Sequence, residues 1–396
     1  MSDTPRIAFL AHGELFVLDG GAPRKIESKF ADQYRARVRS LQRRQAWKEE
    51  GAGARFMRGG GAALWGDDAA LESIPVAYTG VARRGPSTLL YTISTGVVGG
   101  LLELDLESGE EKRIFHSADK RIEQIATSRD HDVIACTVRS KGGLSAVAVM
   151  AGDGSELMPV TDGDVIDLAP SWLPEAAIRE GRRHQLVYQS AGIGRDSAGV
   201  FVAIGPASIA LLDAEAGDMQ VLFESPQRDF LMPRMDARRT LYAVRRPYAD
   251  VTRPSPTKAA LDLLLFPLRL GMAVIAYLSF FTLRYTGRPL FTSGDARQRS
   301  ADIRQMMMTG NLASARESAS REAEKAAVDA VRDWELVTIA EDKTERVLAR
   351  GVRAYDVLGD GRCVVTDGAR IQLIDSDGNA ALLHEERSIT EVVALD

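Results

Sequence analysis

The residue types that most often carry catalysis or bind metals are scattered along this chain. The five histidines, His12, His116, His131, His184 and His384, share no common spacing. The patterns HExxH, CxxC and GxSxG, which bring metal ligands or an activated serine together, do not occur in the sequence. We therefore expect no catalytic residue, no cofactor and no metal site, and the chain is predicted not to be an enzyme.

Four charged residues could instead form a binding or catalytic site. Arg129, Asp167, Arg234 and Asp356 each lie in a short segment that reads as the first strand of a repeat. A fold that gathers these first strands around an axis would bring the four side chains to a central channel. The alternative prediction is therefore an enzyme or small-ligand sensor with its site at that channel.

The other candidate side chains have simpler structural explanations. Acidic pairs such as Asp67–Asp68 and Glu110–Glu111 fall in predicted turns, where a solvated charge is expected. Cys136 and Cys363 lie in predicted strands, so we expect two small buried side chains and neither a disulfide nor a metal site.

One hairpin pattern recurs and organises the chain. Its clearest copy, Ile209 to Phe223, reads as an apolar strand, a turn with Asp213 and Gly217, and a second apolar strand. Glycine tolerates a positive φ, and aspartate can hydrogen-bond its own turn. Two further strands precede most copies, and a spacing of about 40 residues is typical of propeller blades. The sequence therefore predicts an all-β, six-bladed β-propeller. The other copies begin at Gly13, Leu101, Ser145, Trp334 and Ile371.

The ends of the chain predict how this propeller closes. The first hairpin lacks an innermost strand before it, and the last residues form a strand with nothing after it. We expect Ser388 to Asp396 to pair beside Arg6–Leu10, which closes the ring and removes the exposed sheet edges. Residues 1–396 are then a single propeller domain.

Residues 166–244 resemble the TolB-type, WD-repeat-like β-propeller family. The segment LAPSWLP, with Pro170 and Trp172, is similar to the Pro–Trp–Ser–Pro box of that family. The segment LMPRMDARRTLYAV, with Pro233 and Asp236, is similar to the next copy of the box. The resemblance implies a propeller fold and a protein-interaction role in a bacterial protein.

Charge and the N-terminal residues bear on location and partners. The net charge of −5 over 396 residues creates no global field that would attract nucleic acid, so we expect no nucleic-acid partner. The segment MSDTPRIAFLAHGELF lacks the basic region and the continuous apolar run of a signal peptide. We therefore expect a cytoplasmic location.

The first predicted insertion spans about 31–72 and begins with a basic helix. A glycine-rich run follows, but no GK[ST] completes a phosphate-binding loop. The helix is either a solvated element before a flexible connector or a patch for anionic lipid headgroups or an acidic partner. The basic side chains of this patch are Arg35, Arg37, Arg39, Arg43, Arg44 and Lys48.

The second predicted insertion spans about 250–333 and contains an apolar segment followed by a helical hairpin. Residues 263–283 are apolar on every side and would reach about 31 Å as a helix, near the thickness of a bilayer core. Because the segment lies between two strands of one blade, a single crossing would separate those strands, so we do not expect a simple span. Its contact residues are predicted to be Leu263, Leu264, Leu265, Phe266, Leu268, Leu270, Met272, Val274, Ile275, Tyr277, Leu278, Phe280, Phe281 and Leu283.

Three uses of this apolar segment remain open: lipid contact, a partner protein or self-association, and burial inside the protein. Antiparallel strand order places both insertions, and a smaller one at 192–208, on one face of the propeller. The sequence therefore predicts a non-enzymatic scaffold that mediates protein–protein interactions. It would associate with a membrane, or with a membrane-bound assembly, through that face as a cytoplasmic, peripheral membrane protein.

Overall fold

The computed structural model shows a nearly all-β protein. Most described residues belong to one compact unit made of 1–31, 75–249 and 305–396. Helix among the described residues is limited to 29–34, with residue 36, and a 3-10 turn η1 at Glu175–Ala177. The structure describes residues 4–34, 36, 76–94, 99–117, 119–128, 130, 132–139, 144–195, 201–248 and 331–395.

The described strands form six antiparallel groups, which we number in chain order. A single parallel pair, Ser145 with Ile166, joins groups 3 and 4 into one larger sheet. In hydrogen-bonding order, groups 1 to 3 are β25 (Ile389–Ala394), β1 (Ile7–Ala11), β2 (Glu14–Leu18), β3 (Arg24–Ile26); β4 (Ala77–Arg83), β5 (Thr88–Ser94), β6 (Gly99–Asp105), β7 (Glu111–Ser117); and β8 (Arg121–Thr127), β9 (Val133–Arg139), β10 (Ser145–Ala151), β11 (Met158–Pro159).

Groups 4 to 6 repeat this order. They are β12 (Val165–Trp172), β13 (Gln185–Arg195), β15 (Ser208–Asp213), β16 (Met219–Phe223); β17 (Arg228–Met235), β18 (Leu241–Pro247), β19 (Glu335–Ile339), β20 (Glu345–Arg350); and β21 (Ala354–Val357), β22 (Cys363–Thr366), β23 (Arg370–Ile374), β24 (Ala380–Glu385). The short strand β14 (Phe201–Ile204) pairs with the end of β13.

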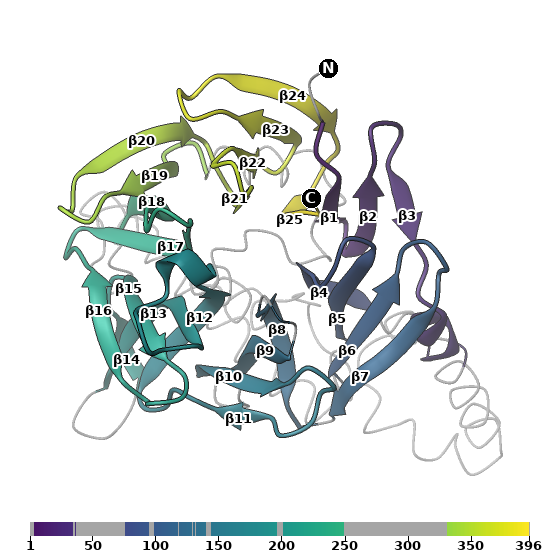
Figure 1. The fold of residues 1–396 in the computed structure, drawn as a ribbon, viewed down its shortest axis with the longest axis horizontal. Helices are drawn as coiled ribbons and strands as arrows, with labels where there is room; N and C mark the ends of the chain where they lie inside the picture. The colour runs from purple at the N-terminus through teal and green to yellow at the C-terminus, as the bar shows by residue number, and fades with distance from the viewer. Residues whose placement is uncertain are drawn as a thin grey trace, which may run out of the picture. The chain divides into compact units, whose positions relative to one another are not determined.

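The first strand of each group lies nearest the middle of the unit (Figure 1). These inner strands are β25, β4, β8, β12, β17 and β21, and each contacts the inner strand of the next group. The inner strand β25 comes from the end of the chain and pairs antiparallel with β1, with Phe9 opposite Val392. Strand β21 also contacts β25, so the series of inner-strand contacts returns to group 1.

One junction recurs between neighbouring groups. The start of the third strand of one group lies against the start of the inner strand of the next. In group 1 the Tyr78 N–H donates to Gly13 O at 3.0 Å, and in group 5 the Gly351 N–H donates to Trp334 O at 2.7 Å. Because the same strand ends meet each time, they define one face of the unit, here called the junction face. The corresponding contacts of the other groups are Gly99 with Arg121, Ser145 with Ile166, Ala207 with Phe230, and Gly368 with Ile389.

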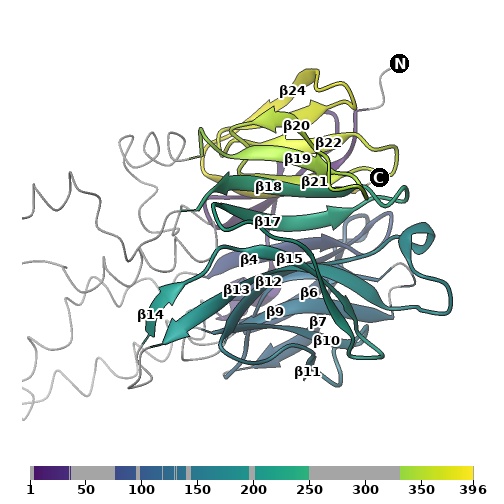
Figure 2. The same cartoon turned by 90° about the vertical axis from the view of Figure 1, so that its left-hand side faces the viewer.

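The chain leaves the described strands for its long insertions at this junction face. Residues 27–76 connect β3 to β4, and residues 248–334 connect β18 to β19. Near the smaller insertion, β13 continues to Arg195 and pairs with β14, so part of 192–208 is a strand extension and not only a loop. In Figure 2 this extension projects beyond the sheets on one side.

The six predicted hairpins are confirmed as paired strands, and their turns explain why. In the β15–β16 turn, Asp213 Oδ1 accepts the backbone N–H groups of Glu215 and Ala216. Gly217 follows with a φ of 73°, which glycine adopts without a steric cost. The side chain and the glycine therefore fix the turn that the sequence pattern predicts.

Apolar side chains pack between neighbouring groups rather than on one side of each sheet. Phe9, Leu90 and Leu186 are fully buried, because neighbours cover both faces of their strands. Cys136 and Cys363 are buried free thiols, as predicted. No helix among the described residues is long and apolar enough to cross a membrane.

Candidate functional site at the inner strands

Two of the predicted channel residues come together where groups 5 and 6 meet. Arg234 on β17 lies with its Nε 3.6 Å from Oδ1 of Asp356 on β21. The other carboxylate oxygen of Asp356 accepts the N–H of Ala394 on β25, at 2.9 Å. A single carboxylate therefore connects the inner strands of groups 5, 6 and 1.

Glu391 on β25 adds a second carboxyl group to this cluster. The pKa of Glu391 is raised to about 7, mainly by burial and to a smaller extent by the nearby Asp356 carboxylate. The backbone N–H of Val81 and the positive charge of Arg234 act in the opposite direction. Burial also raises the pKa of Asp356, while Arg234 lowers it. We call Arg234, Asp356 and Glu391 the inner cluster.

The inner cluster combines one fixed cation with two carboxyl groups that resist ionisation. A carboxyl group with a pKa near 7 exchanges a proton at physiological pH, which is a property of general acids and bases. The same shift arises without any reaction when a carboxylate is partly desolvated beside another. One guanidinium beside two carboxyl groups suits proton exchange and the recognition of charged groups.

Side-chain amides also join neighbouring groups, from Gln124 on the inner strand β8 and from Gln189 on β13, the second strand of group 4. Gln124 Oε1 accepts the N–H of Ala169 at 3.0 Å, and Gln189 Oε1 accepts the N–H of Met232 at 2.9 Å. Each donor sits at a β-bulge with a positive φ, 52° in both cases. Tyr355 OH then donates to Met232 O at 2.7 Å. These contacts satisfy the backbone groups that the bulges leave unpaired.

Asp167 does not join the inner cluster. Its side chain is only 2% exposed on β12, and burial raises its pKa, while hydrogen bonds to Ser190 and Thr161 lower it. The pKa of the neighbouring Tyr188 is raised by burial and by Asp167. Arg129, the fourth predicted channel residue, lies outside the described residues.

The prediction for Glu111 as a solvated turn residue is wrong. Glu111 begins β7, and its Oε2 accepts the backbone N–H of Phe30 at 3.0 Å. Its Oε1 accepts hydrogen bonds from Ser28 and from the hydroxyl of Tyr91. Ser28 Oγ in turn accepts the N–H of Ala31 at 3.1 Å, as a helix N-cap does. Glu111 therefore fixes the start of the helix that leads into the first insertion.

The remaining predicted contact residues lie outside the part of the chain that the structure describes. They include the basic patch of Arg35, Arg37, Arg39, Arg43, Arg44 and Lys48. The apolar segment 263–283 also lies outside the described residues, as does the acidic pair Asp67–Asp68. Their roles stay predictions.

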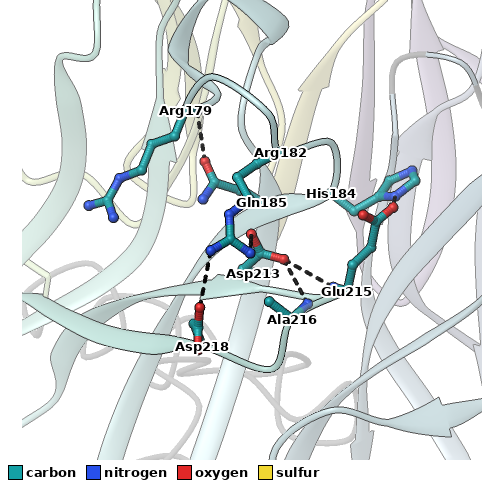
Figure 3. A network of polar contacts seen from close by, with 8 residues as sticks. All are labelled: Arg179, Arg182, His184, Gln185, Asp213, Glu215, Ala216 and Asp218. Carbon is teal, nitrogen blue, oxygen red and sulfur yellow. Dashed lines mark hydrogen bonds and ion pairs between the residues drawn. The ribbon is translucent and has the colours of Figure 1, made fainter.

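A second polar network occupies the face opposite the junction face, in the turns of group 4 (Figure 3). Arg182 binds Asp213 and Asp218, each at 3.2 Å. His184 Nδ1 lies 2.8 Å from Oε1 of Glu215, and its ring meets the edge of Trp172 with the centroids 5.7 Å apart. The network fixes the β12–β13 connection against the β15–β16 turn.

His184 also takes part in the one group of the described residues whose donor atoms suit a divalent cation. The ligand atoms of Asp130, Asp132 and His184 lie within 4.8 Å of one another. Both aspartates are exposed to solvent. His184 contacts Glu215 through Nδ1, and its Nε2 lies 3.8 Å from Oδ1 of Asp132, so the histidine joins the exposed aspartates to the polar network of group 4.

Comparisons with known proteins find similar folds but do not indicate a function. No family model matches the chain, and no curated protein matches it. Among solved structures, a nidogen–laminin complex matches with a TM-score of 0.50 and 9% identity, over 98% of this chain and 98% of that one. TolB from Acinetobacter baumannii matches at 0.47 and 12%, over 98% of this chain and 66% of that one. The tricorn protease matches at 0.46 and 11%, over 99% and 34%.

These likenesses lie below 25% identity, so they concern the fold alone. The resemblance to the TolB-type propellers, predicted from residues 166–244, is confirmed as a structural relationship at low sequence identity. The chain therefore has a TolB-like β-propeller fold.

Proposed function

We propose that this chain is a non-enzymatic propeller scaffold that acts at a membrane, or at a membrane-bound assembly, through its junction face. The six strand groups are its blades, and β25 closes the ring. One observation carries the proposal: the strand ends that flank both long insertions lie at the same face. The connections that carry the predicted apolar segment and the predicted basic helix start from this face, which suits a single interaction surface.

The two insertions suggest the chemistry of the partner. Residues 263–283 are predominantly apolar, with Arg269 as their one charged residue, and the basic patch provides six positive charges. Each Lys or Arg near an anionic membrane contributes about 1 kcal/mol, and this part weakens with salt. The contact of Glu111 with Ser28 and Phe30 supports a fixed starting point for the basic helix. The partner is therefore an anionic membrane, or a protein assembly held at one, on the cytoplasmic side.

The geometry of the inner cluster is consistent with a structural role. Asp356 is occupied by Arg234 and by the N–H of Ala394, both from neighbouring groups. A carboxylate that holds three strands together is poorly suited to change its position during a reaction. We therefore assign the cluster to the closure of the ring and not to catalysis.

Flotation with anionic liposomes tests the proposal. The full chain is compared with a variant in which residues 257–292 are replaced by a Gly/Ser linker of equal length. A matched control exchanges Arg35, Arg39 and Arg43 for glutamate and leaves the apolar segment intact. We expect the full chain to float, the linker variant to stay with soluble protein, and the charge variant to float less well at low salt.

The outcomes distinguish lipid contact from protein–protein contact. Flotation that depends on residues 257–292 supports lipid contact. Oligomers that the linker abolishes, without flotation, make the segment a protein–protein element in a partner complex or in self-association. A dispersed monomer that does not float overturns the proposal.

The second candidate function is recognition of a small charged ligand at the inner cluster. The raised pKa of Glu391 beside Arg234 and Asp356 favours it. This alternative predicts that Ca²⁺, Mg²⁺ or phosphate raises the unfolding temperature of the wild type and leaves an Asp356→Asn variant unchanged. If none of these ions shifts the wild-type transition, the sensor hypothesis loses its support.

A further inference from the structure

Arg353 is a buried cation at the junction of groups 6 and 1. It precedes β21, and its residue is 4% exposed. Its backbone N–H donates to Thr366 O at 2.7 Å, so the main chain is fixed on the neighbouring strand β22. The side chain therefore starts from a rigid position in the sheet.

The guanidinium of Arg353 lacks acceptors on one edge. Its Nε and Nη2 atoms are buried and have no hydrogen-bond partner. These two nitrogens lie on the same edge of the planar group, which is the edge that binds a carboxylate or phosphate through two parallel hydrogen bonds. Two other well-shielded arginines are paired: Arg246 with Asp229 at 2.8 Å, and Arg139 with Glu123 at 3.0 Å.

An unpaired buried guanidinium is unfavourable, because burial removes its water without replacing the lost hydrogen bonds. Burial lowers the pKa of Arg353 to about 10, so the group still carries its charge at neutral pH. Arginine cannot relieve this cost by losing its proton under physiological conditions. The position therefore calls for a counter-anion.

The surrounding backbone makes room for this side chain. A Cβ atom at Gly368 would lie 3.2 Å from Nη1 and 3.4 Å from Cδ of Arg353. Gly368 also has a φ of 99°, and its carbonyl accepts the N–H of Ile389 on the closing strand at 2.9 Å. The glycine thus holds the junction together while it leaves space for the guanidinium.

We propose that the Nε and Nη2 edge of Arg353 binds an oxyanion, a carboxylate or a phosphate group, at the junction of groups 6 and 1. The anion pairs with the buried charge and stabilises the contact between β21 and the closing strand β25. None of the contacts that define this site involves the insertions, so the proposal holds whether or not the chain binds membranes.

Thermal unfolding of the full chain tests this site with inorganic phosphate and acetate as probes, against chloride at equal ionic strength. The variants are Arg353→Met, Arg353→Lys and the control Arg370→Met, which removes an exposed arginine of the same group. We expect at least one oxyanion to raise the unfolding temperature of the wild type and of Arg370→Met, with saturation. Arg353→Met should show no such rise, and Arg353→Lys a smaller one.

A direct readout covers the case in which Arg353→Met does not fold. The Nε–H resonance of Arg353 in the wild-type protein should shift on titration with the oxyanion that stabilises the fold. Three results overturn the proposal: no oxyanion effect beyond chloride, an equal effect in Arg353→Met, or a silent Arg353 resonance during the titration. The comparison of phosphate with acetate separates the two ligand classes.

Discussion

The Nε atom of Arg234 lies 3.6 Å from Oδ1 of Asp356, so an ion pair joins groups 5 and 6 where their inner strands meet. Asp356 also accepts the N–H of Ala394 on β25. The Asp356 carboxylate therefore links groups 5, 6 and 1, although Arg234 and Asp356 are far apart in the sequence.

Replacing Asp356 with alanine should destabilise the fold by about 2–4 kcal/mol, because Arg234 and the Ala394 N–H both lose their acceptor. Urea denaturation measures the change in the free energy of unfolding. The control is Glu341→Ala, which removes an exposed partner of Arg239 and should cost less than about 0.5 kcal/mol. Equal effects of the two substitutions would contradict the structural role of Asp356.

Glu391→Gln should change how stability depends on pH. The pKa of Glu391 is raised from 4.5 to about 7 in the folded state, so the folded protein binds more protons between these values. Its contribution to stability is therefore fully present below pH 4.5 and is lost as the pH rises to 7. We expect the free energy of unfolding of Glu391→Gln to exceed that of the wild type by about 1–3 kcal/mol at pH 8. The lower end is expected because the Glu391 side chain is partly exposed.

Unfolding free energies measured at pH 4 and pH 8 check this prediction. The difference between Glu391→Gln and the wild type should be larger at pH 8. A difference that does not vary with pH would mean that Glu391 ionises normally in the folded protein.

Gln189→Met should lower the free energy of unfolding by about 1–3 kcal/mol, because the N–H of Met232 loses its acceptor while the side-chain volume is nearly kept. Chemical denaturation provides the measurement. Gln220, on an exposed part of β16, offers a matched control, and Gln220→Met should change stability by less than about 0.5 kcal/mol. If Gln189→Met behaves like the control, the amide contact does not hold the two groups together.

Removal of residues 388–396 should leave the edge of β1 unpaired and the apolar surface around Phe9 uncovered, so the truncated chain should aggregate. Val392→Asp tests the same contact with one substitution, because Val392 is 2% exposed. Arg387→Ala, at an exposed position before the strand, is the control. Size-exclusion chromatography and thermal unfolding measure the outcome. A truncated protein that elutes as a monomer and unfolds at an unchanged temperature would contradict closure by β25.

The hairpins could be predicted from the sequence because an aspartate and a glycine mark several of their turns. The inner-strand bulges could not, because Gln124, Ala169 and Met232 share no residue type although all three have a positive φ. Bulges of this kind depend on acceptors from the neighbouring group, which are distant in the sequence.

The inner cluster was predicted in part. Arg234 and Asp356 could be assigned because each lies in an inner strand of its repeat. Glu391 was missed, although the sequence placed it in the closing strand, and the same inner-strand criterion would have found it. Glu111 could not be found, since its partners Ser28 and Tyr91 belong to other strands or connections.

Fluorescence quenching at two labelled positions tests the central claim, that the junction face meets an anionic membrane. Cys136 and Cys363 are buried, so single cysteines can be labelled selectively at exposed positions. Gln227→Cys, in the β16–β17 connection, reports on the junction face, and Ser376→Cys, in the β23–β24 turn, reports on the opposite face. With vesicles that contain phosphatidylglycerol and nitroxide-labelled lipid, we expect strong quenching at position 227 and little at 376. Quenching that is equal at both, stronger at 376, or absent from both would contradict the account.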